Sequence, residues 1–203
     1  MGVKLTFLSL WMPKYFISRE LDAISNLTVQ ALKEALNNHS SNTSLKAEAT
    51  ERQSMKSINA KRAFMAKQHT VLVEALAEAL GQETAVKVGR EALLKVGEQL
   101  GKQNRDRLGV GDSPDDIIKT AKIMYRVLGI KFRIEWTGTN QGLLTVDHCA
   151  LAKYYSELTC RVLSATDEGV MEGLNPNMSM KFEKEITGGC NVCTARIERR
   201  NQV

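Results

Sequence analysis

Seven consecutive residues, 130–136, alternate strictly between apolar and polar side chains. The apolar positions are Ile130, Phe132, Ile134 and Trp136, and the polar positions are Lys131, Arg133 and Glu135. This period of two is typical of a β-strand with one buried face. Because such a face has to be covered by another layer of structure, we expect residues 130–136 to belong to an antiparallel sheet packed on a helix.

A strong helix signal precedes this strand. Ser113, Pro114, Asp115 and Asp116 combine a capping side chain, a proline suited to the first turn and two carboxylates at the positive end of the helix dipole. An apolar stripe follows at helical spacing, and Gly129 is placed to end it. We therefore expect a helix that leads directly into the strand.

Two longer helices are expected before it, over residues 64–79 and 83–107. Gly81 separates them, and the second carries Gly89, Gly97 and Gly101 on one face. Each interior glycine costs about 1 kcal/mol relative to alanine, so the row needs a reason. Close packing of another helix is the favoured explanation, and close approach of a ligand is the alternative.

The rest of the chain predicts one more helix and three more strands. A turn at 137–142 leads to a strand at 143–146, and a long helix is expected over 150–171. Further strands are expected at 178–186 and 193–198, separated by Gly188-Gly189. From residue 62 the order is α-α-α-β-β-α-β-β. The predicted fold is therefore α+β, with a helical N-terminal half followed by an antiparallel sheet of about four strands and a long packed helix.

The chain is expected to divide near residue 60. Residues 1–60 form an N-terminal basic segment, partly helical, with a polar loop at 36–60, and residues 61–203 form a single α+β domain. The first 62 residues carry nine Lys/Arg and five Asp/Glu, which is most of the net charge of +5. Regulation through nucleic-acid contact is one reading of this charge, but no zinc-finger spacing, zipper or aromatic-interleaved patch supports it. We therefore do not expect a nucleic-acid partner.

The chain is expected to act in the cytoplasm. The apolar stretch from Leu5 to Met12 is short and has no cleavage pattern of small residues, and no run of 18 apolar residues exists. No membrane partner is therefore expected. In a reducing compartment, the four cysteines are free, metal-bound or catalytic rather than paired in disulfides.

The cysteines are the candidate chemical groups. If residues 150–171 are helical, then Ser156, Cys160 and Asp167 share a face with Cys149, opposite the apolar core stripe. The strand after this helix should run back along it and bring Cys190 and Cys193 toward its start. We therefore expect Cys149 and Cys193 in one concave site, with Cys160 further along the helix.

One use of these thiols is metal binding. Cys149, Cys160, Cys190 and Cys193 could form a four-thiolate site for zinc or an iron–sulfur cluster, and Cys190-Asn191-Val192-Cys193 is a C-x-x-C motif. Geometry opposes a single site, because Cys149 and Cys160 would lie about 16 Å apart along one helix. Buried free thiols without a chemical role are the simplest alternative.

The other use is nucleophilic catalysis. Cys149, Cys160 and Cys193 would line the site, with Asp167 as a base or orienting group and His148 as a proton carrier. Cys149 is expected next to a helix N-terminus, where the dipole favours a thiolate.

The chain resembles the L-2-amino-thiazoline-4-carboxylic acid hydrolase family at these positions. The similarity lies in Cys149-Ala150-Leu151-Ala152, Cys160, Asp167, Leu174-Asn175-Pro176, Gly189 and Cys193, with the Leu80-Gly81 helix end and Gly89 and Gly97 upstream. It covers roughly residues 62–198. Ala150 replaces a common proline, and Cys190 is an additional cysteine. The fold is also similar to vinyl-reductase-type small-molecule-binding domains. The resemblance implies opening of a cyclic thiazoline amino acid by water.

The leading hypothesis is therefore a hydrolase-like protein that acts on a small C–N-containing molecule, of the thiazoline or cyclic amidine type, through a cysteine-lined site. The alternative is a non-enzymatic sensor or carrier that binds a metal or small ligand with Cys149, Cys160, Cys190 and Cys193. The expected partner is a small molecule, and a homo-oligomer is compatible with the sequence.

Overall fold

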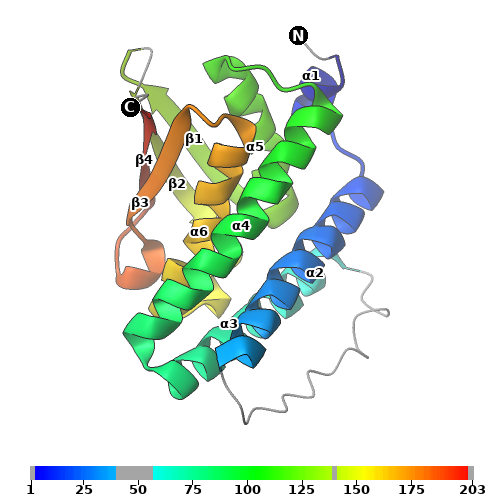
Figure 1. Ribbon diagram of the computed structural model, residues 1–203. Coiled ribbons are helices and arrows are strands. Elements are labelled where there is room, and N and C mark those ends of the chain that lie inside the picture. The colour runs from blue at the N-terminus through cyan, green and yellow to red at the C-terminus, as the bar shows by residue number, and fades with distance from the viewer. Residues whose placement is uncertain (1–2, 40–56, 139–140, 201–203) are drawn as a thin grey trace.

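The computed structural model describes residues 3–39, 57–138 and 141–200. Five helices come first: α1 (Val3–Leu10), α2 (Lys14–His39), α3 (Ile58–Leu80), α4 (Gln82–Leu108) and α5 (Pro114–Leu128). Then come strands β1 (Ile130–Trp136) and β2 (Gln141–Cys149), the 3-10 turn η2 (Ala152–Tyr154), helix α6 (Glu157–Leu174), strand β3 (Met178–Lys184), the 3-10 turn η3 (Ile186–Gly188) and strand β4 (Cys193–Arg199). The sheet is antiparallel in the order β1-β2-β4-β3. The predicted α+β class is confirmed (Figure 1).

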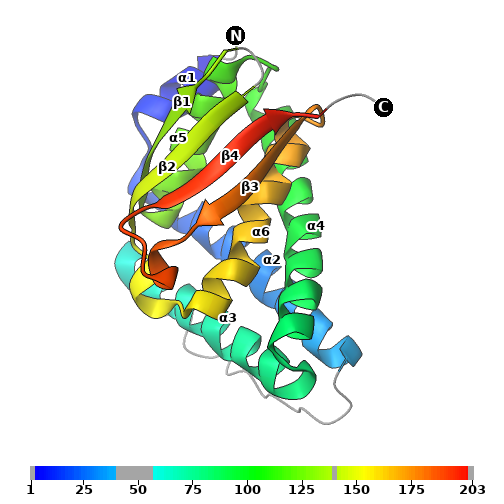
Figure 2. The ribbon, with the colours of Figure 1, turned by 90° about the vertical axis from the view of Figure 1, so that its left-hand side faces the viewer.

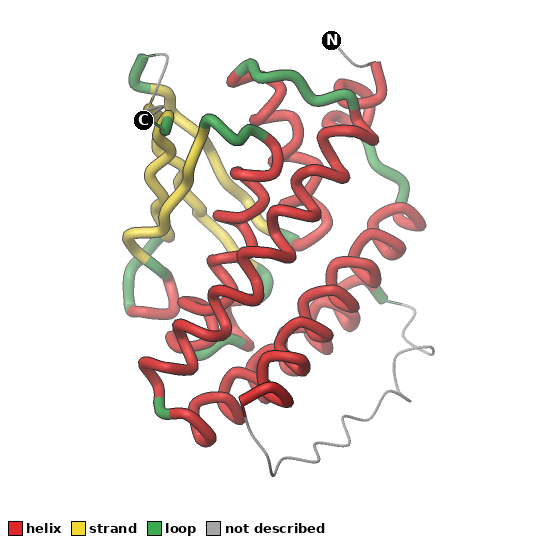
Figure 3. The backbone as a smooth tube through the Cα atoms, viewed as in Figure 1, coloured by secondary structure: helices red, strands yellow, loops and turns green. Residues whose placement is uncertain are grey.

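The molecule is layered, with the sheet on one side and the helices on the other (Figure 2). Helices α5 and α6 lie directly against the sheet, α4 packs on the far side of α6, and α2 and α3 lie beyond (Figure 3). One face of the sheet is therefore covered, and its apolar residues form a core with α5 and α6. This core includes Leu144, Val146, Met180, Ala195 and Ile197.

The predicted connection between α5 and β1 is present in detail. The Ser113 hydroxyl accepts a hydrogen bond from the Asp116 N–H at 3.1 Å, and Gly129 ends α5 in a left-handed conformation with φ of 76°. Phe132 on β1 then meets Tyr125 on α5 edge to face, with ring centroids 4.8 Å apart. The cap and the end of α5, together with the apolar face of β1, therefore determine how α5 packs on the sheet.

The start of the long helix was predicted wrongly. Helix α6 begins at Glu157 rather than near Ala150, because the Ser156 hydroxyl caps it by accepting the Thr159 N–H at 3.1 Å. Cys149 is the last residue of β2, and η2 lies between the two elements. Cys149 and Cys160 therefore come from a strand and a helix, and the 16 Å separation along one helix does not apply.

The glycine row of α4 packs against α6. A Cβ atom on Gly101 would lie 2.8 Å from the Cα of Gly173, and one on Gly169 would lie 2.9 Å from the main-chain nitrogen of Glu98. The two helices therefore touch main chain to main chain, and helix packing explains the row. This contact presents the opposite side of α6 to the sheet.

Helices α1 and α2 contribute to the same core as the rest of the chain. Leu5 and Leu21 cluster with Met65 and Leu100, and Leu32 clusters with Leu76. Residues 40–56, which hold most of the predicted polar loop, lie outside the described residues. The division near residue 60 stays a prediction about folding. In the described part of the chain, no helix has the length and apolar character needed to cross a membrane.

Candidate active site

A cavity of about 100 Å³ lies between α6, the sheet and α3. Three thiols from three elements line it: Cys149 at the end of β2, Cys160 in the first turns of α6 and Cys193 at the start of β4. Asp167, two turns after Cys160 on α6, lines it as well. The late start of α6 and the return of β4 beside β2 bring these residues together.

The cavity thiols are held in their neutral form. Burial raises the pKa of all three, for Cys160 to about 12. Hydrogen bonds oppose this effect at all three, from the Thr187 side chain at Cys160 and from main-chain N–H groups at the other two. The N–H groups of Leu151 and Ala152 at the start of η2 lower the pKa of Cys149, and the Ile186 N–H donates to the sulfur of Cys193 at 3.3 Å. Cys149 and Cys193 therefore have donors that would support a thiolate once one forms.

Asp167 is the carboxyl group of the cavity. Burial raises its pKa to about 7, although a hydrogen bond from the Tyr125 hydroxyl acts in the opposite direction. The negative charge of Asp167 in turn raises the pKa of both Cys149 and Cys193. A carboxyl that exchanges its proton near neutral pH, within electrostatic range of two thiols, is suited to general acid–base chemistry.

A buried polar chain that sequence reasoning missed completes the lining. His69 on α3 is 1% exposed and lies between two hydroxyls, with Thr28 Oγ1 2.8 Å from Nε2 and Tyr155 Oη 2.8 Å from Nδ1. Because the Thr28 hydroxyl donates to the Ile24 carbonyl, Nε2–H donates to Thr28 and Nδ1 accepts from Tyr155. The available signal was the position of His69 on the buried face of α3, four residues after Met65 and three before Leu72.

Two of the predicted site residues lie elsewhere. His148 is exposed on β2 opposite Lys131 and lines a surface groove instead of the cavity. Cys190 is half-buried in the connection between η3 and β4 and is not among the cavity's lining residues. Neither is therefore positioned to act inside the cavity.

The predicted metal site has no geometric support. Within residues 3–39, 57–138 and 141–200, no group of three or more His, Cys, Asp or Glu side chains is arranged to hold a metal ion. The set of Cys149, Cys160, Cys190 and Cys193 for zinc or an iron–sulfur cluster stays a prediction.

Solved structures with low sequence identity share the fold. A trafficking protein particle complex subunit 3 from Naegleria fowleri, described as covalently bound to palmitic acid, aligns with a TM-score of 0.56 and 15% identity over 70% of this chain and 96% of its own. The phenol-responsive sensory domain of the transcription activator PoxR aligns with a TM-score of 0.50 and 13% identity, covering 66% of this chain and 74% of its own. At these identities the similarity concerns the fold alone.

Sequence comparison identifies the family. No relative is found among curated proteins. The family of L-2-amino-thiazoline-4-carboxylic acid hydrolases matches residues 56–197, which include α3 and all the later elements up to β4. The match spans all four cysteines and Asp167. This chain belongs to the L-2-amino-thiazoline-4-carboxylic acid hydrolase family.

Proposed function

We propose that this protein hydrolyses a small molecule containing a C=N bond, of the thiazoline or cyclic amidine type, inside the cysteine-lined cavity. The observation that carries the proposal is that Cys149, Cys193 and Asp167 line one cavity. The cavity of about 100 Å³ is well below the ~300–1,000 Å³ of pockets for drug-sized ligands. It therefore suits a small reacting group rather than a large ligand.

Cys149 is the proposed nucleophile, because two main-chain N–H groups point at its sulfur. The ionised form of Asp167 accepts the thiol proton, the sulfur bonds to the carbon of the C=N bond, and Asp167 returns the proton to the nitrogen. In the adduct of a cyclic amidine or a 2-amino-thiazoline, the attacked carbon carries two nitrogens, and a proton moves from one to the other as a C–N bond breaks, which leaves a thioimidate on Cys149. One water then hydrolyses the thioimidate to an amide and restores the thiol.

A carrier or sensor function is the second candidate. It is favoured by the raised pKa of the cavity thiols, which keeps them poorly nucleophilic in the free protein. By analogy of fold, the Naegleria protein carries palmitic acid covalently and the PoxR domain responds to phenol. In this case the ligand would occupy the cavity and be released without chemical change.

The deciding experiment uses the full chain with thiazoline and cyclic amidine compounds, and measures both product formation and the melting temperature. If the protein is a hydrolase, the natural protein should turn over at least one of these compounds. Turnover should fall by at least about 100-fold in Cys149→Ser and in Asp167→Asn, because each variant lacks the nucleophile or the general base. Turnover should be retained in Cys190→Ser, which removes a thiol outside the cavity.

The two candidate functions give different results. A ligand that raises the melting temperature of the natural protein but is recovered unchanged supports the carrier. Equal turnover in Cys149→Ser and Cys190→Ser would overturn the proposed role of Cys149. Detection of a covalent adduct on the Cys149 peptide by mass spectrometry would support the nucleophile directly.

A further inference from the structure

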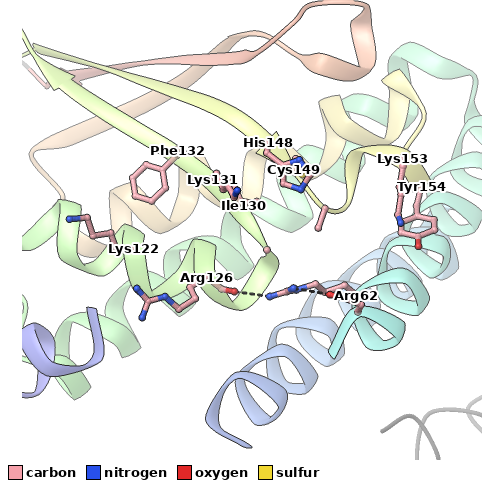
Figure 4. A pocket seen from close by; sticks show the side chains of 13 residues that line it. Arg62, Lys122, Arg126, Ile130, Lys131, Phe132, His148, Cys149, Lys153 and Tyr154 are labelled. Atoms are coloured by element: carbon pink, nitrogen blue, oxygen red, sulfur yellow. Dashed lines mark hydrogen bonds between the residues drawn. The ribbon is translucent and has the colours of Figure 1, made fainter. Parts of the chain in front are cut away.

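A groove of about 770 Å³ on the surface is lined by positively charged side chains (Figure 4). They come from different elements: Lys122 and Arg126 from α5, Lys131 from β1, Lys153 from η2 and Arg62 from α3. None of the residues that line it is Asp or Glu. None of these five cations forms an ion pair with a carboxylate in the described part of the chain.

The two arginines are held in place by main-chain carbonyls. Arg62 donates to the carbonyls of Val127 at 2.9 Å and Arg126 at 2.7 Å, at the C-terminal end of α5, and Arg126 donates to the Ser9 carbonyl at 2.8 Å. These contacts offset part of the positive charge of Arg62. The same contacts fix both guanidinium groups in space. The two groups therefore contribute a constant positive potential to the groove.

The three lysines carry the charge that the fold leaves uncompensated. Lys122, Lys131 and Lys153 are all exposed, and the ammonium group of Lys153 lies 4.8 Å from the ring centre of Tyr154. Positive charges gathered on one concave surface repel each other and raise the local electrostatic potential. A bound anion would lower this potential and reduce the repulsion. The groove is therefore suited to a ligand with more than one negative charge.

The groove and the cavity meet at two residues. Cys149 and Ile130 line both, so the proposed nucleophile stands at the boundary between them. The cavity alone is small, whereas the groove has room for a larger polar group. A ligand spanning the two would place its charged end among the lysines and its uncharged end beside Cys149.

We propose that this groove is a binding site for a phosphate-type, multiply charged anionic group, carried by a ligand whose uncharged part reaches Cys149. The placement of the uncharged part rests on the proposed function, whereas anion binding by the groove does not. A single carboxylate is a poorer match, because one cation would suffice for it. The ligand class is thus a phosphate ester or diphosphate of a small organic molecule.

The first test measures anion binding by calorimetry with the full-length protein. Pyrophosphate and inorganic phosphate should bind, and acetate should bind at least about tenfold more weakly. The double variant Lys122→Ala/Lys131→Ala should weaken pyrophosphate binding by about tenfold or more. The control Lys181→Ala/Lys184→Ala removes the same charge from exposed positions of β3 and should leave binding unchanged. Equal loss in both double variants, or no measurable binding, would overturn the anion site.

The second test asks whether the groove leads to Cys149. Iodoacetate is anionic and iodoacetamide is neutral, so the ratio of their alkylation rates at Cys149 reports the local potential. This ratio should fall in Lys122→Ala/Lys131→Ala and stay constant in Lys181→Ala/Lys184→Ala, as followed by mass spectrometry of the Cys149 peptide. Pyrophosphate should slow the reaction with iodoacetate. An unchanged ratio in Lys122→Ala/Lys131→Ala would show that the charge of the groove does not act at Cys149.

The source of the phosphate group is distinguished by two further probes. Glycerol 3-phosphate should compete with pyrophosphate if the ligand is a soluble ester. Co-sedimentation with phosphatidic acid vesicles, without competition by glycerol 3-phosphate, would overturn the soluble-ester assignment in favour of a lipid head group. Because none of these measurements uses turnover, a groove that binds pyrophosphate in a protein that hydrolyses no C=N compound would refute only the proposed function.

Discussion

Gly97 on α4 and Thr166 on α6 are in main-chain contact: a Cβ atom on Gly97 would overlap the main-chain oxygen of Thr166 and lie 2.9 Å from the nitrogen of Val170. Thr166 directly precedes Asp167, which lines the cavity. The glycine row therefore lets α4 and α6 approach to main-chain contact. The packing contact between α4 and α6 thus lies one residue away from the carboxyl group that lines the cavity.

Substitution Gly97→Ala should lower the free energy of unfolding by about 1–3 kcal/mol, because the new methyl group meets main-chain atoms that cannot move aside individually. This cost exceeds the gain of about 1 kcal/mol in helix propensity. Denaturant unfolding of the full chain measures it. Gly188→Ala is the control, since a Cβ there would meet nothing closer than 3.8 Å. Equal stability of the two variants would contradict the close helix contact.

Asp167 should make the protein less stable as the pH rises. Its pKa is about 7 in the folded protein against an ordinary value of 3.8, so the folded state binds more protons between pH 4 and pH 7. The free energy of unfolding should therefore fall through this window, by at most about 4 kcal/mol at ~1.4 kcal/mol per pKa unit. Asp167→Asn should remove this slope. Compared with the natural protein, the variant should therefore gain stability at pH values above 7 relative to pH 4.

The control for this measurement is Asp106→Asn, which changes an exposed carboxyl on α4. It should keep the slope of the natural protein between pH 4 and pH 7. If Asp167→Asn keeps the same slope as Asp106→Asn, then Asp167 is already ionised in the folded state and is not the acid–base group proposed here.

The polar chain through His69 should contribute measurably to stability. Tyr155→Phe removes the hydroxyl that donates to Nδ1 of His69 at 2.8 Å, and the loss of this buried hydrogen bond should cost about 0.5–1.5 kcal/mol. Tyr154→Phe is the matched control, because no described residue forms a hydrogen bond with its hydroxyl. Thermal and denaturant unfolding compare the two, and a larger loss in Tyr154→Phe would refute the assignment.

The sequence predicted those features that local patterns determine. The Ser113 cap, the Gly129 end and the alternation in β1 act within a few residues, and all three are present. The start of α6 was missed because the helical pattern of apolar residues extends back to Leu151, whereas the Ser156 cap interrupts it. His69 was missed because its partners Thr28 and Tyr155 are 41 and 86 residues away in the chain. Contacts at such separations have no local signal.

Removal of residues 1–56 should destabilise the remainder, although the sequence predicts that residues 61–203 fold alone. Leu21, Leu32 and Leu36 of α2 are at most 2% exposed and pack on α3 and its neighbours, so truncation would expose an apolar surface. We expect a lower melting temperature and a broader transition. Adding a peptide of residues 1–39 should restore part of the loss. An unchanged transition in the truncated chain would establish the division near residue 60.

The four thiols should differ in reactivity according to their position. Burial raises the pKa of Cys149, Cys160 and Cys193, so at pH 8 only a small fraction of each is the reactive thiolate. Cys160, with a pKa of about 12, should react most slowly with iodoacetamide, and Cys190, which lies outside the cavity, should react fastest. Mass spectrometry of the four cysteine peptides over time gives the order. Raising the pH from 8 to 10 should accelerate the alkylation of Cys149 and Cys193, because a larger fraction of each thiol is then ionised. A cavity cysteine that reacts faster than Cys190 at pH 7 would show a thiolate already formed in the free protein, and would favour a nucleophile that needs no help from Asp167.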